Sequence, residues 1–344
     1  MKRKRRFFAP LWRPLLIGIF CSFVSSTSSC ATAAPAISGV IDQSAASEDG
    51  VRLIYLGTGG WIFERGNDQV ITGPFFSNPG LVKTGLLPIQ SDSDVVDEFM
   101  SRYDVSGAHV ILVGHAHYDH LMDVPRVALE HAPSARIVGS KTVKNTLGTW
   151  SGVGDRVDEV NDIAGDESTV GTWMSYGAGV RIMALRSLHA PHFEGYTLFK
   201  GSRVRSLNAE PRWAAEWLDG MTHAYLIDFL NPDGSIAFRI YYQDAVAPPP
   251  LGFAPRAVIR ERPVDAAILV PATFDQVDWH PEAFIENLQP QRVLLGHWEN
   301  FFSPPVSPAD PLSNFAHFED RLERVFDGEW WKPELWTEFR FPTR

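Results

Sequence analysis

The sequence predicts an α+β fold, a four-layer sandwich in which two β-sheets pack face to face between outer layers of helices. Short apolar strands alternate with helical segments, and they do so in two successive sets along the chain. This order is expected when each sheet carries its own helical layer. The chain has 344 residues and is 44% hydrophobic, so it can bury a substantial core in one domain.

The N-terminus has the organisation of a secretory signal peptide. Basic residues 2–6 precede a short apolar run at 15–24, and a Ser/Thr/Ala-rich stretch follows. This is the order of regions found in exported proteins. We therefore expect residues 1–33 to be a signal peptide, residues 34–50 to be a flexible spacer, and residues 51–344 to be the folded domain.

The fate of the leader has two alternatives to simple cleavage. The segment Thr27-Ser-Ser-Cys30 resembles a lipidation site, although it lacks the usual Leu three residues before the Cys. The apolar run is short for a membrane span, which argues against a retained anchor. Both cysteines, Cys21 and Cys30, lie in the leader, so the folded domain has no disulfide. The predicted location is the periplasm or cell envelope.

The folded domain is strongly acidic. The first 30 residues contain six basic and no acidic residues, so removing them changes the formal charge from −10 to −16. An acidic surface repels phosphate backbones, and we therefore expect no nucleic-acid partner.

The expected elements follow from apolar alternation, helical periodicity and turn residues. Strands are expected at residues 51–56, 61–64, 69–72, 110–113, 136–139, 179–185, 224–229, 236–242, 266–270, 292–295 and 335–341. Helices are expected at residues 91–103, 122–131, 141–150, 210–218, 281–288 and 314–326. The segment Asn231-Pro-Asp-Gly234 predicts a hairpin turn between two of the strands.

A cluster of metal-binding side chains follows the strand at 110–113. Within His115-Ala-His-Tyr-Asp-His120 there are three imidazoles and one carboxylate, although the whole chain has only 11 His. These side chains bind zinc and similar ions. His115 and His117 have the spacing that places two side chains on one face of an extended segment. Asp119 and His120 follow where the chain turns, so they can serve a second ion.

Further ligand candidates occur at the ends of later strands. His189, Asp244 and His297 each follow an apolar strand. His192 is an alternative to His189, because it lies only three residues further on. Five other histidines have no partner spacing, and we interpret them as structural or solvated: His109, His131, His223, His280 and His317.

The pattern resembles the metallo-β-lactamase superfamily of binuclear metal hydrolases, over residues 51–344. The resemblance implies a four-layer αββα metallo-β-lactamase sandwich. It also implies that His115, His117 and His189 hold one ion. Residues Asp119, His120 and His297 would hold the other, and Asp244 would bridge both.

The segments at 70–77, 115–120 and 293–302 are most similar to the branch that contains ascorbate-6-phosphate lactonase-like proteins and N-acylphosphatidylethanolamine phospholipase D. This chain departs from the branch at Gly73, where Asp usually precedes Pro. It also departs around Asp244, which lies in Tyr241-Tyr-Gln-Asp-Ala245 rather than between Gly and Thr.

The chemistry expected of such a site is hydrolysis. Two divalent ions, zinc or alternatively manganese or iron, can share a hydroxide that attacks an ester, lactone or phosphodiester. Asp119 would orient this hydroxide as a catalytic residue. The substrate is expected to be a small molecule or a lipid, with membrane contact only through the leader or a lipid anchor. The alternative function is a non-catalytic binding or sensor protein that keeps the metals. A di-iron oxidoreductase would require Glu in place of His117, so His117 argues against this alternative.

The region between Leu198 and Thr222 is the candidate substrate element. Residues 210–218 predict a helix with Trp213 and Trp217 on one face. This helix could act as a lid over the site, or it could pack on the sandwich through its tryptophans.

Overall fold

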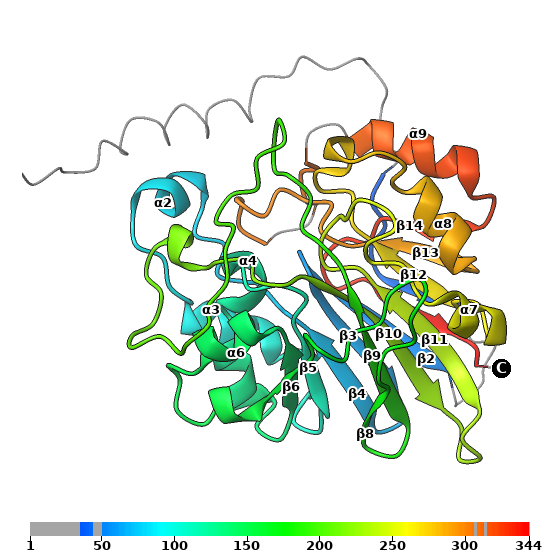
Figure 1. The fold of residues 1–344 in the computed structure, drawn as a ribbon, viewed down its shortest axis with the longest axis horizontal. Helices are drawn as coiled ribbons and strands as arrows, with labels where there is room; N and C mark the ends of the chain where they lie inside the picture. The colour runs from blue at the N-terminus through cyan, green and yellow to red at the C-terminus, as the bar shows by residue number, and fades with distance from the viewer. Residues whose placement is uncertain (1–34, 44–49, 306–307, 313–314, 344) are drawn as a thin grey trace, which may run out of the picture.

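The computed structural model describes residues 35–43, 50–305, 308–312 and 315–343. In these residues two mixed sheets share a core, and helices lie on both outer sides (Figure 1). The predicted four-layer αββα sandwich is therefore confirmed. The predicted signal peptide, residues 1–33, lies outside the described residues.

The first sheet contains eight strands, of which the four from β4 to β7 run parallel. In spatial order its strands are β1 (Val40–Asp42), β15 (Glu338–Phe341), β2 (Val51–Gly57), β3 (Gly60–Arg65), β4 (Asp68–Thr72), β5 (Val110–Leu112), β6 (Arg136–Gly139) and β7 (Val157–Glu159).

The second sheet contains seven strands, and the four from β11 to β14 run parallel. In spatial order its strands are β14 (Glu329–Trp331), β13 (Arg292–Leu295), β12 (Ala266–Leu269), β11 (Ile236–Tyr242), β10 (His223–Leu230), β9 (Val180–Arg186) and β8 (Met174–Tyr176). The β10–β11 pair is the hairpin that the turn at 231–234 predicts.

The helices form the two outer layers. They are α2 (Leu81–Leu86), α3 (Ser93–Met100), α4 (Tyr118–Leu121), α5 (Val124–Arg126), α6 (Lys141–Leu147), α7 (Arg256–Glu261), α8 (Glu282–Leu288) and α9 (Phe315–Val325). Figure 1 shows α3 and α6 beside the first sheet and α7, α8 and α9 beside the second. Within the described part of the chain, every helix is too short or too polar to cross a bilayer.

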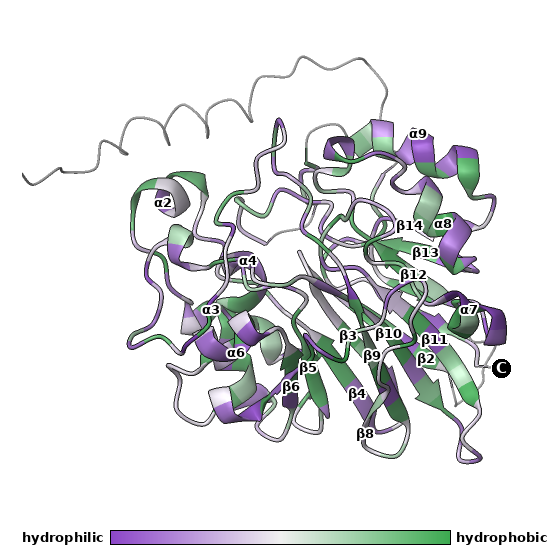
Figure 2. Cartoon of the chain, viewed as in Figure 1, coloured by the Kyte–Doolittle hydropathy of each residue, from purple (hydrophilic) through white to green (hydrophobic). Residues whose placement is uncertain are grey.

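Strands of the first sheet are apolar on both faces because both faces are buried. In β2, Leu53 and Tyr55 belong to the core between the sheets, whereas Ile54 and Leu56 face the helical layer. Figure 2 shows hydrophobic colour along the strands and hydrophilic colour on parts of the outer helices. The pleat therefore decides which side chains of each strand meet the other sheet and which meet the helices.

Part of the predicted spacer is a strand instead. Residues 40–42 form β1, which pairs in parallel with β15 at the edge of the first sheet. Gln43 continues this pairing, because its N–H donates to the Arg340 carbonyl at 2.8 Å, and its side-chain Nε2 donates to Glu329 Oε2 of β14 in the second sheet at 2.9 Å. Residues 34 and 44–49 of the spacer lie outside the described residues. The strand was missed because three residues carry too little alternation to identify.

The predicted helix at 210–218 is wrong. The structure has only one 3-10 turn there, at Ala214–Glu216. Trp217 is 1% exposed and packs near Trp150, with ring centroids 6.3 Å apart, while Trp213 is 45% exposed. The two tryptophans therefore do not share a face. Trp217 is a core residue, which supports the packing alternative over the lid.

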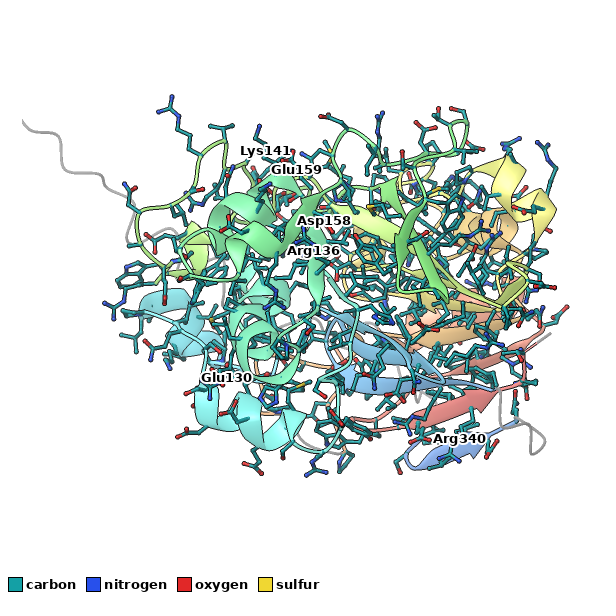
Figure 3. The ribbon with its side chains drawn as sticks, turned by 90° about the horizontal axis from the view of Figure 1, so that it is seen from below. Glu130, Arg136, Lys141, Asp158, Glu159 and Arg340 are labelled. Carbon is teal, nitrogen blue, oxygen red and sulfur yellow. The ribbon has the colours of Figure 1, made fainter. Side chains whose placement is uncertain are left out.

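Charged side chains close one edge of the sandwich. Arg136 in β6 forms an ion pair with Asp158 in β7, and Tyr176 in β8 donates its hydroxyl to Asp158 at 3.0 Å. Figure 3 shows Arg136, Asp158 and Glu159 gathered in this region. Charge on an edge strand discourages pairing with another sheet, and the tyrosine ties the edges of the two sheets together.

One buried ion pair fixes the outer face of the second sheet. Arg239 is fully buried, and its guanidinium donates to both carboxylate oxygens of Asp228 at 2.7 and 2.8 Å. It also donates to the carbonyls of Val258 and Arg262, both at 2.8 Å. These bonds attach the α7 region to the sheet.

We expect Asp228→Ala to lower the free energy of unfolding by about 3–5 kcal/mol, because it leaves a buried guanidinium without its carboxylate. Urea denaturation followed by circular dichroism measures this. The matched control is Glu167→Ala, which removes the partner of the exposed Arg256 and should cost less than about 1 kcal/mol. Equal losses in the two variants would contradict the assignment.

Candidate metal centre

The His115–His120 motif begins three residues after β5 and continues into α4. His115 and His117 precede α4, and Asp119 and His120 lie within its single turn. All four side chains are buried. Figure 1 shows α4 beyond the ends of the central strands. Strand β5 fixes where the motif starts, and the helical turn of α4 sets the directions of Asp119 and His120.

The second sheet brings the three later candidates to the same place. His189 comes three residues after β9, Asp244 two residues after β11, and His297 two residues after β13. These strands run in one direction, so their carboxyl ends lie at one edge of the sheet. The chain ends of both sheets therefore meet around one point, as in other open sheets that bind ligands at this edge.

The structure brings His115, His117 and His189 together. Each offers a ligand atom within 4.8 Å of the others. The Nε2 atoms of His115 and His117 are buried and have no hydrogen-bond partner among the described residues. His189 lies with its Nδ1 at 2.7 Å from the Ala190 carbonyl, to which it donates. Its Nε2 is then deprotonated in the neutral ring and available as a ligand.

Asp119, His120 and His297 form the second group. Asp119 Oδ2 lies 3.3 Å from His120 Nε2 and 3.4 Å from His297 Nε2. The Nδ1 atom of His297 is buried without a hydrogen-bond partner among the described residues. Asp119 and His120 also share a metal-competent cluster with His115. The two groups are therefore contiguous rather than separate sites.

Asp244 lies between the two groups. Its Oδ2 is 2.7 Å from His115 Nδ1, and its Oδ1 is 2.9 Å from His120 Nδ1. The hydroxyl of Tyr242 donates to Oδ1 at 2.6 Å. One carboxylate thus contacts a histidine of each group at Nδ1, the ring nitrogen opposite the Nε2 atoms available to a metal, which is the position of a carboxylate that orients histidine ligands. A bridging role for Asp244 stays a prediction.

The electrostatics of the metal-free protein favour a cation at this point. Burial, followed by the neighbouring histidines, holds the pKa of His117 and of His189 well below the usual value. Burial also opposes the charge on His120, but the Asp244 and Asp119 carboxylates outweigh it and raise the pKa of His120 to about 10. Two buried carboxylates therefore recruit a proton when no metal replaces it.

These residues could hold divalent metal ions. Three neutral imidazoles meet on one side, two of them with a buried and unpaired nitrogen. Two imidazoles and a carboxylate meet on the other, and Asp244 touches both sets. Imidazole and carboxylate are the ligand set of hydrolytic zinc sites and of related manganese and iron sites.

Two glycines allow Asp244 and His120 to pack closely against the backbone. A Cβ on Gly114 would lie 2.1 Å from the Cβ of Asp244, and a Cβ on Gly59 would lie 2.7 Å from His120 Nδ1. Any other residue at position 114 would have to displace the carboxylate. The close approach of the two sheets at this point therefore depends on a missing side chain.

His297 is held in a left-handed backbone conformation, with φ of 51°. Its N–H donates to the Thr58 carbonyl at 2.8 Å and to the Tyr55 hydroxyl at 3.2 Å. That hydroxyl in turn donates to Glu299 Oε2 at 2.6 Å. Because a non-glycine residue avoids positive φ, these bonds fix the direction of the His297 ring.

His192 stacks on His189 but takes a different role. Their ring centroids are 4.5 Å apart, with an interplanar angle of 12°. His192 Nδ1 accepts the N–H of Leu198 at 3.1 Å, and burial lowers the pKa of His192 to about 4. Of the two histidines, only His189 belongs to the metal-competent clusters found in the described residues. The geometry therefore favours His189 as the ligand.

A cavity of about 440 Å³ opens beside the cluster. Asp119, His120, His189, Asp244 and His297 form part of its wall. Its apolar wall includes Leu198 and Phe199, from the region that the sequence marked as a candidate substrate element, and also Leu81, Phe301, Phe302 and Leu312, which the sequence did not assign to a substrate site. The adjacent Phe pair, four residues after His297 in a loop, was the one available sign of the part outside that region.

The remaining histidines stay outside the cluster. His109 contacts Asp68 at 3.0 Å, His131 contacts Asp97 at 2.9 Å, and His280 contacts the Val270 carbonyl at 2.9 Å. These contacts agree with a structural interpretation. His223 is buried with no hydrogen-bond partner for either ring nitrogen among the described residues.

Comparison with known proteins supports the fold. No protein-family model matches the sequence, and no curated protein matches it. Among solved structures, a metallo hydrolase from the archaeon Ignicoccus hospitalis matches with a TM-score of 0.53 and 16% identity. The match covers 86% of this chain and 100% of that one.

Two other solved structures have lower TM-scores. YhfI from Bacillus subtilis, described as a metallo-β-lactamase fold protein, matches at 0.48 with 11% identity over 85% of this chain and 100% of that one. CmlA from Streptomyces venezuelae, described as a diiron β-hydroxylase, matches at 0.46 with 14% identity over 86% of this chain and 55% of that one. At these identities the likeness concerns the fold. The narrower resemblance to the branch of ascorbate-6-phosphate lactonase-like proteins and N-acylphosphatidylethanolamine phospholipase D stays a prediction.

Ligand removal should reduce the metal content. We expect the purified protein to hold two metal equivalents, and His117→Ala or His297→Ala to lose at least one after dialysis. Even outer-shell changes weaken metal binding by about 10–100-fold, so removing a ligand should cost more. Metal analysis by mass spectrometry measures this. His109→Ala is the control, because His109 pairs with Asp68 outside the cluster; unchanged metal in both ligand variants would refute the site.

Gly114→Ala should disturb the same site without touching a ligand. The added Cβ would overlap Asp244, so we expect lost metal and a destabilisation of about 1–3 kcal/mol. Metal content and thermal unfolding are the measurements. Gly107→Ala is the matched control, because its nearest neighbour would be 3.9 Å away at Gln69. A fully loaded Gly114→Ala protein would show that Asp244 is not confined as described.

Proposed function

We propose that this protein is a hydrolase that uses two divalent metal ions to cleave an ester, lactone or phosphodiester bond. The observation that carries the proposal is that two groups of buried imidazole and carboxylate side chains lie side by side at one cavity, with Asp244 held between a histidine of each group. A structural site could be built from one group alone. Two adjacent groups of ligand candidates that open to one cavity are the arrangement of two-metal hydrolases.

The ions would be zinc, with manganese or iron as alternatives. When bound, they lower the pKa of water and offset the negative charge that develops in the transition state. The chain supplies the remaining functions. Asp119 is ionised, because His120 and His297 together outweigh the effect of burial and hold its pKa well below the usual value. Its free lone pairs can accept a proton of the attacking water and orient it.

His192 would contact the substrate as a hydrogen-bond donor. Since Nδ1 accepts from Leu198, the neutral ring carries its proton on Nε2. The ring lines the cavity beside the metal cluster. In hydrolysis, water adds its oxygen to the acyl carbon or phosphorus and a proton reaches the leaving oxygen. A donor near that oxygen stabilises the charge as the bond breaks.

The setting of the reaction follows from the leader and the charge. We propose that the chain is exported to the periplasm or cell envelope, where it acts on a small molecule or lipid. The acidic folded domain disfavours nucleic acid. Contact with a membrane would come only from the leader or from a lipid attached at Cys30. The resemblance to the lactonase-like and phospholipase D-like branch is the reason for keeping lactones and phosphodiesters among the substrates.

A substrate panel tests the function. The full chain, reconstituted separately with zinc, manganese and iron, is assayed on carboxylic esters, lactones, phosphodiesters and β-lactams. We expect turnover of one of the first three classes, lost on chelation and restored by metal. Asp119→Asn should lower kcat by about 10²–10⁴-fold. Asp97→Asn, on the exposed pair with Arg126, should leave kcat unchanged.

Two metal equivalents with no turnover of any class would overturn the proposal. That result would support the non-catalytic binding or sensor protein instead.

A further inference from the structure

We infer that the substrate is an uncharged carboxylic ester or lactone that carries an extended apolar acyl group. This inference rests on the proposed hydrolase function and narrows its substrate class. The cavity beside the metal cluster has a volume of about 440 Å³, which lies in the range of small-molecule sites, about 300–1,000 Å³. The cavity therefore has room for a substrate much larger than the cleaved bond and its immediate neighbours.

The charge of the cavity wall disfavours a phosphate substrate. Among the described residues that line it, there is no Lys or Arg, and the anionic groups are the carboxylates of Asp119 and Asp244. Proteins usually neutralise phosphate with Arg, with Lys or with the N-terminus of a helix. Here only the metal ions could offset a phosphodiester, and its flanking groups would meet apolar side chains. A neutral acyl group has no such requirement.

Hydrogen bonds hold the apolar wall of the cavity in place. Asp123 is fully buried, and it accepts hydrogen bonds from the backbone N–H groups of Phe76 and Ser77 at 2.7 and 2.9 Å. The adjacent Asn78 donates to the carbonyls of Phe301 and Ser303, both at 2.9 Å. The loop that carries the two phenylalanines is thereby fixed to the segment that packs on α4.

The apolar character continues from the cavity onto the surface. Leu81 lines the cavity at the start of α2, and the next residue, Val82, is 70% exposed. Leu86 and Leu87, at the other end of the same short helix, are also exposed. Figure 2 shows hydrophobic colour at both ends of α2. A chain longer than the cavity would therefore leave it along an apolar surface.

The reaction implied is simple acyl transfer to water. The bond between the acyl carbon and the ester oxygen breaks, water supplies hydroxyl to the acyl carbon, and its second proton goes to the leaving oxygen. A carboxylic acid and an alcohol result, or a hydroxy acid from a lactone. No oxidant or further reactant is needed.

The test compares acyl length and charge in one series. The metal-loaded full chain is assayed on p-nitrophenyl acetate, butyrate and octanoate, on γ-butyrolactone and γ-dodecalactone, and on bis(p-nitrophenyl) phosphate. We expect kcat/KM to rise at least about tenfold from acetate to octanoate, because each buried methylene can add up to roughly fourfold. The longer lactone should exceed the shorter one, and the phosphodiester should be the poorest.

A matched pair of variants locates the effect. Leu198→Ala removes part of the wall and should lower kcat/KM for the octanoate by roughly tenfold, with little change for the acetate. Leu129→Ala makes the same change at a surface position outside the cavity and should change neither value. Binding of straight-chain methyl ketones by calorimetry gives a readout independent of turnover, and affinity should rise with chain length only where Leu198 is intact.

The possible failures are distinguishable. If the phosphodiester is preferred, or if rate and ketone affinity do not depend on acyl length, the inferred substrate class is wrong while the hydrolase function stands. If no ester, lactone or phosphodiester is turned over, the proposed function fails and the inference fails with it.

Discussion

The buried carboxylate of Asp244 is the constraint on which the rest of the site depends. A carboxylate away from water is costly unless ion pairs and hydrogen bonds compensate it. Here His115, His120 and Tyr242 all contact its two oxygens within 2.9 Å. His115 and His120 follow the first sheet, whereas Tyr242 belongs to the second. Satisfying this one charge therefore requires the two sheets to meet at a fixed distance, and Gly114 permits that distance because it has no side chain.

The convergence of seven ligand candidates follows from strand direction. The motif follows β5, and the three later candidates follow β9, β11 and β13, so all seven lie at the carboxyl ends of strands. Parallel strands need connections that pass over the outer faces, and these connections become the helical layers. The chain can then return to the same edge several times with a short loop each time. Ligand candidates that are far apart in the sequence therefore come together without long connecting loops.

The sequence allowed the sandwich and the ligand candidates to be predicted, because both follow local patterns. Apolar runs identify the long strands, and the residues just beyond them identify the edge where polar groups gather. Strands of three residues such as β1 and β7 carry no usable period and were missed. The predicted helix at 210–218 failed because local spacing cannot show that Trp217 packs in the core while Trp213 stays exposed. The apolar wall was anticipated only at Leu198 and Phe199, because the loop that carries Phe301 is positioned by long-range bonds such as Asn78 to Phe301.

The metal centre and the apolar wall are joined by the backbone of Asp219. Its carbonyl accepts the N–H of Ala116, between His115 and His117, and its N–H donates to the carbonyl of Phe199 in the wall. Its side chain accepts the N–H of Gly201 at 2.7 Å. Because such bonds are already formed in the free protein, substrate binding need not order this wall, and less binding energy is lost to ordering. The same bonds make the distance between the metal cluster and the cavity a property of the fold. An acyl group held by the wall would then meet the site at a fixed depth, so selectivity for chain length and the position of the cleaved bond are set together.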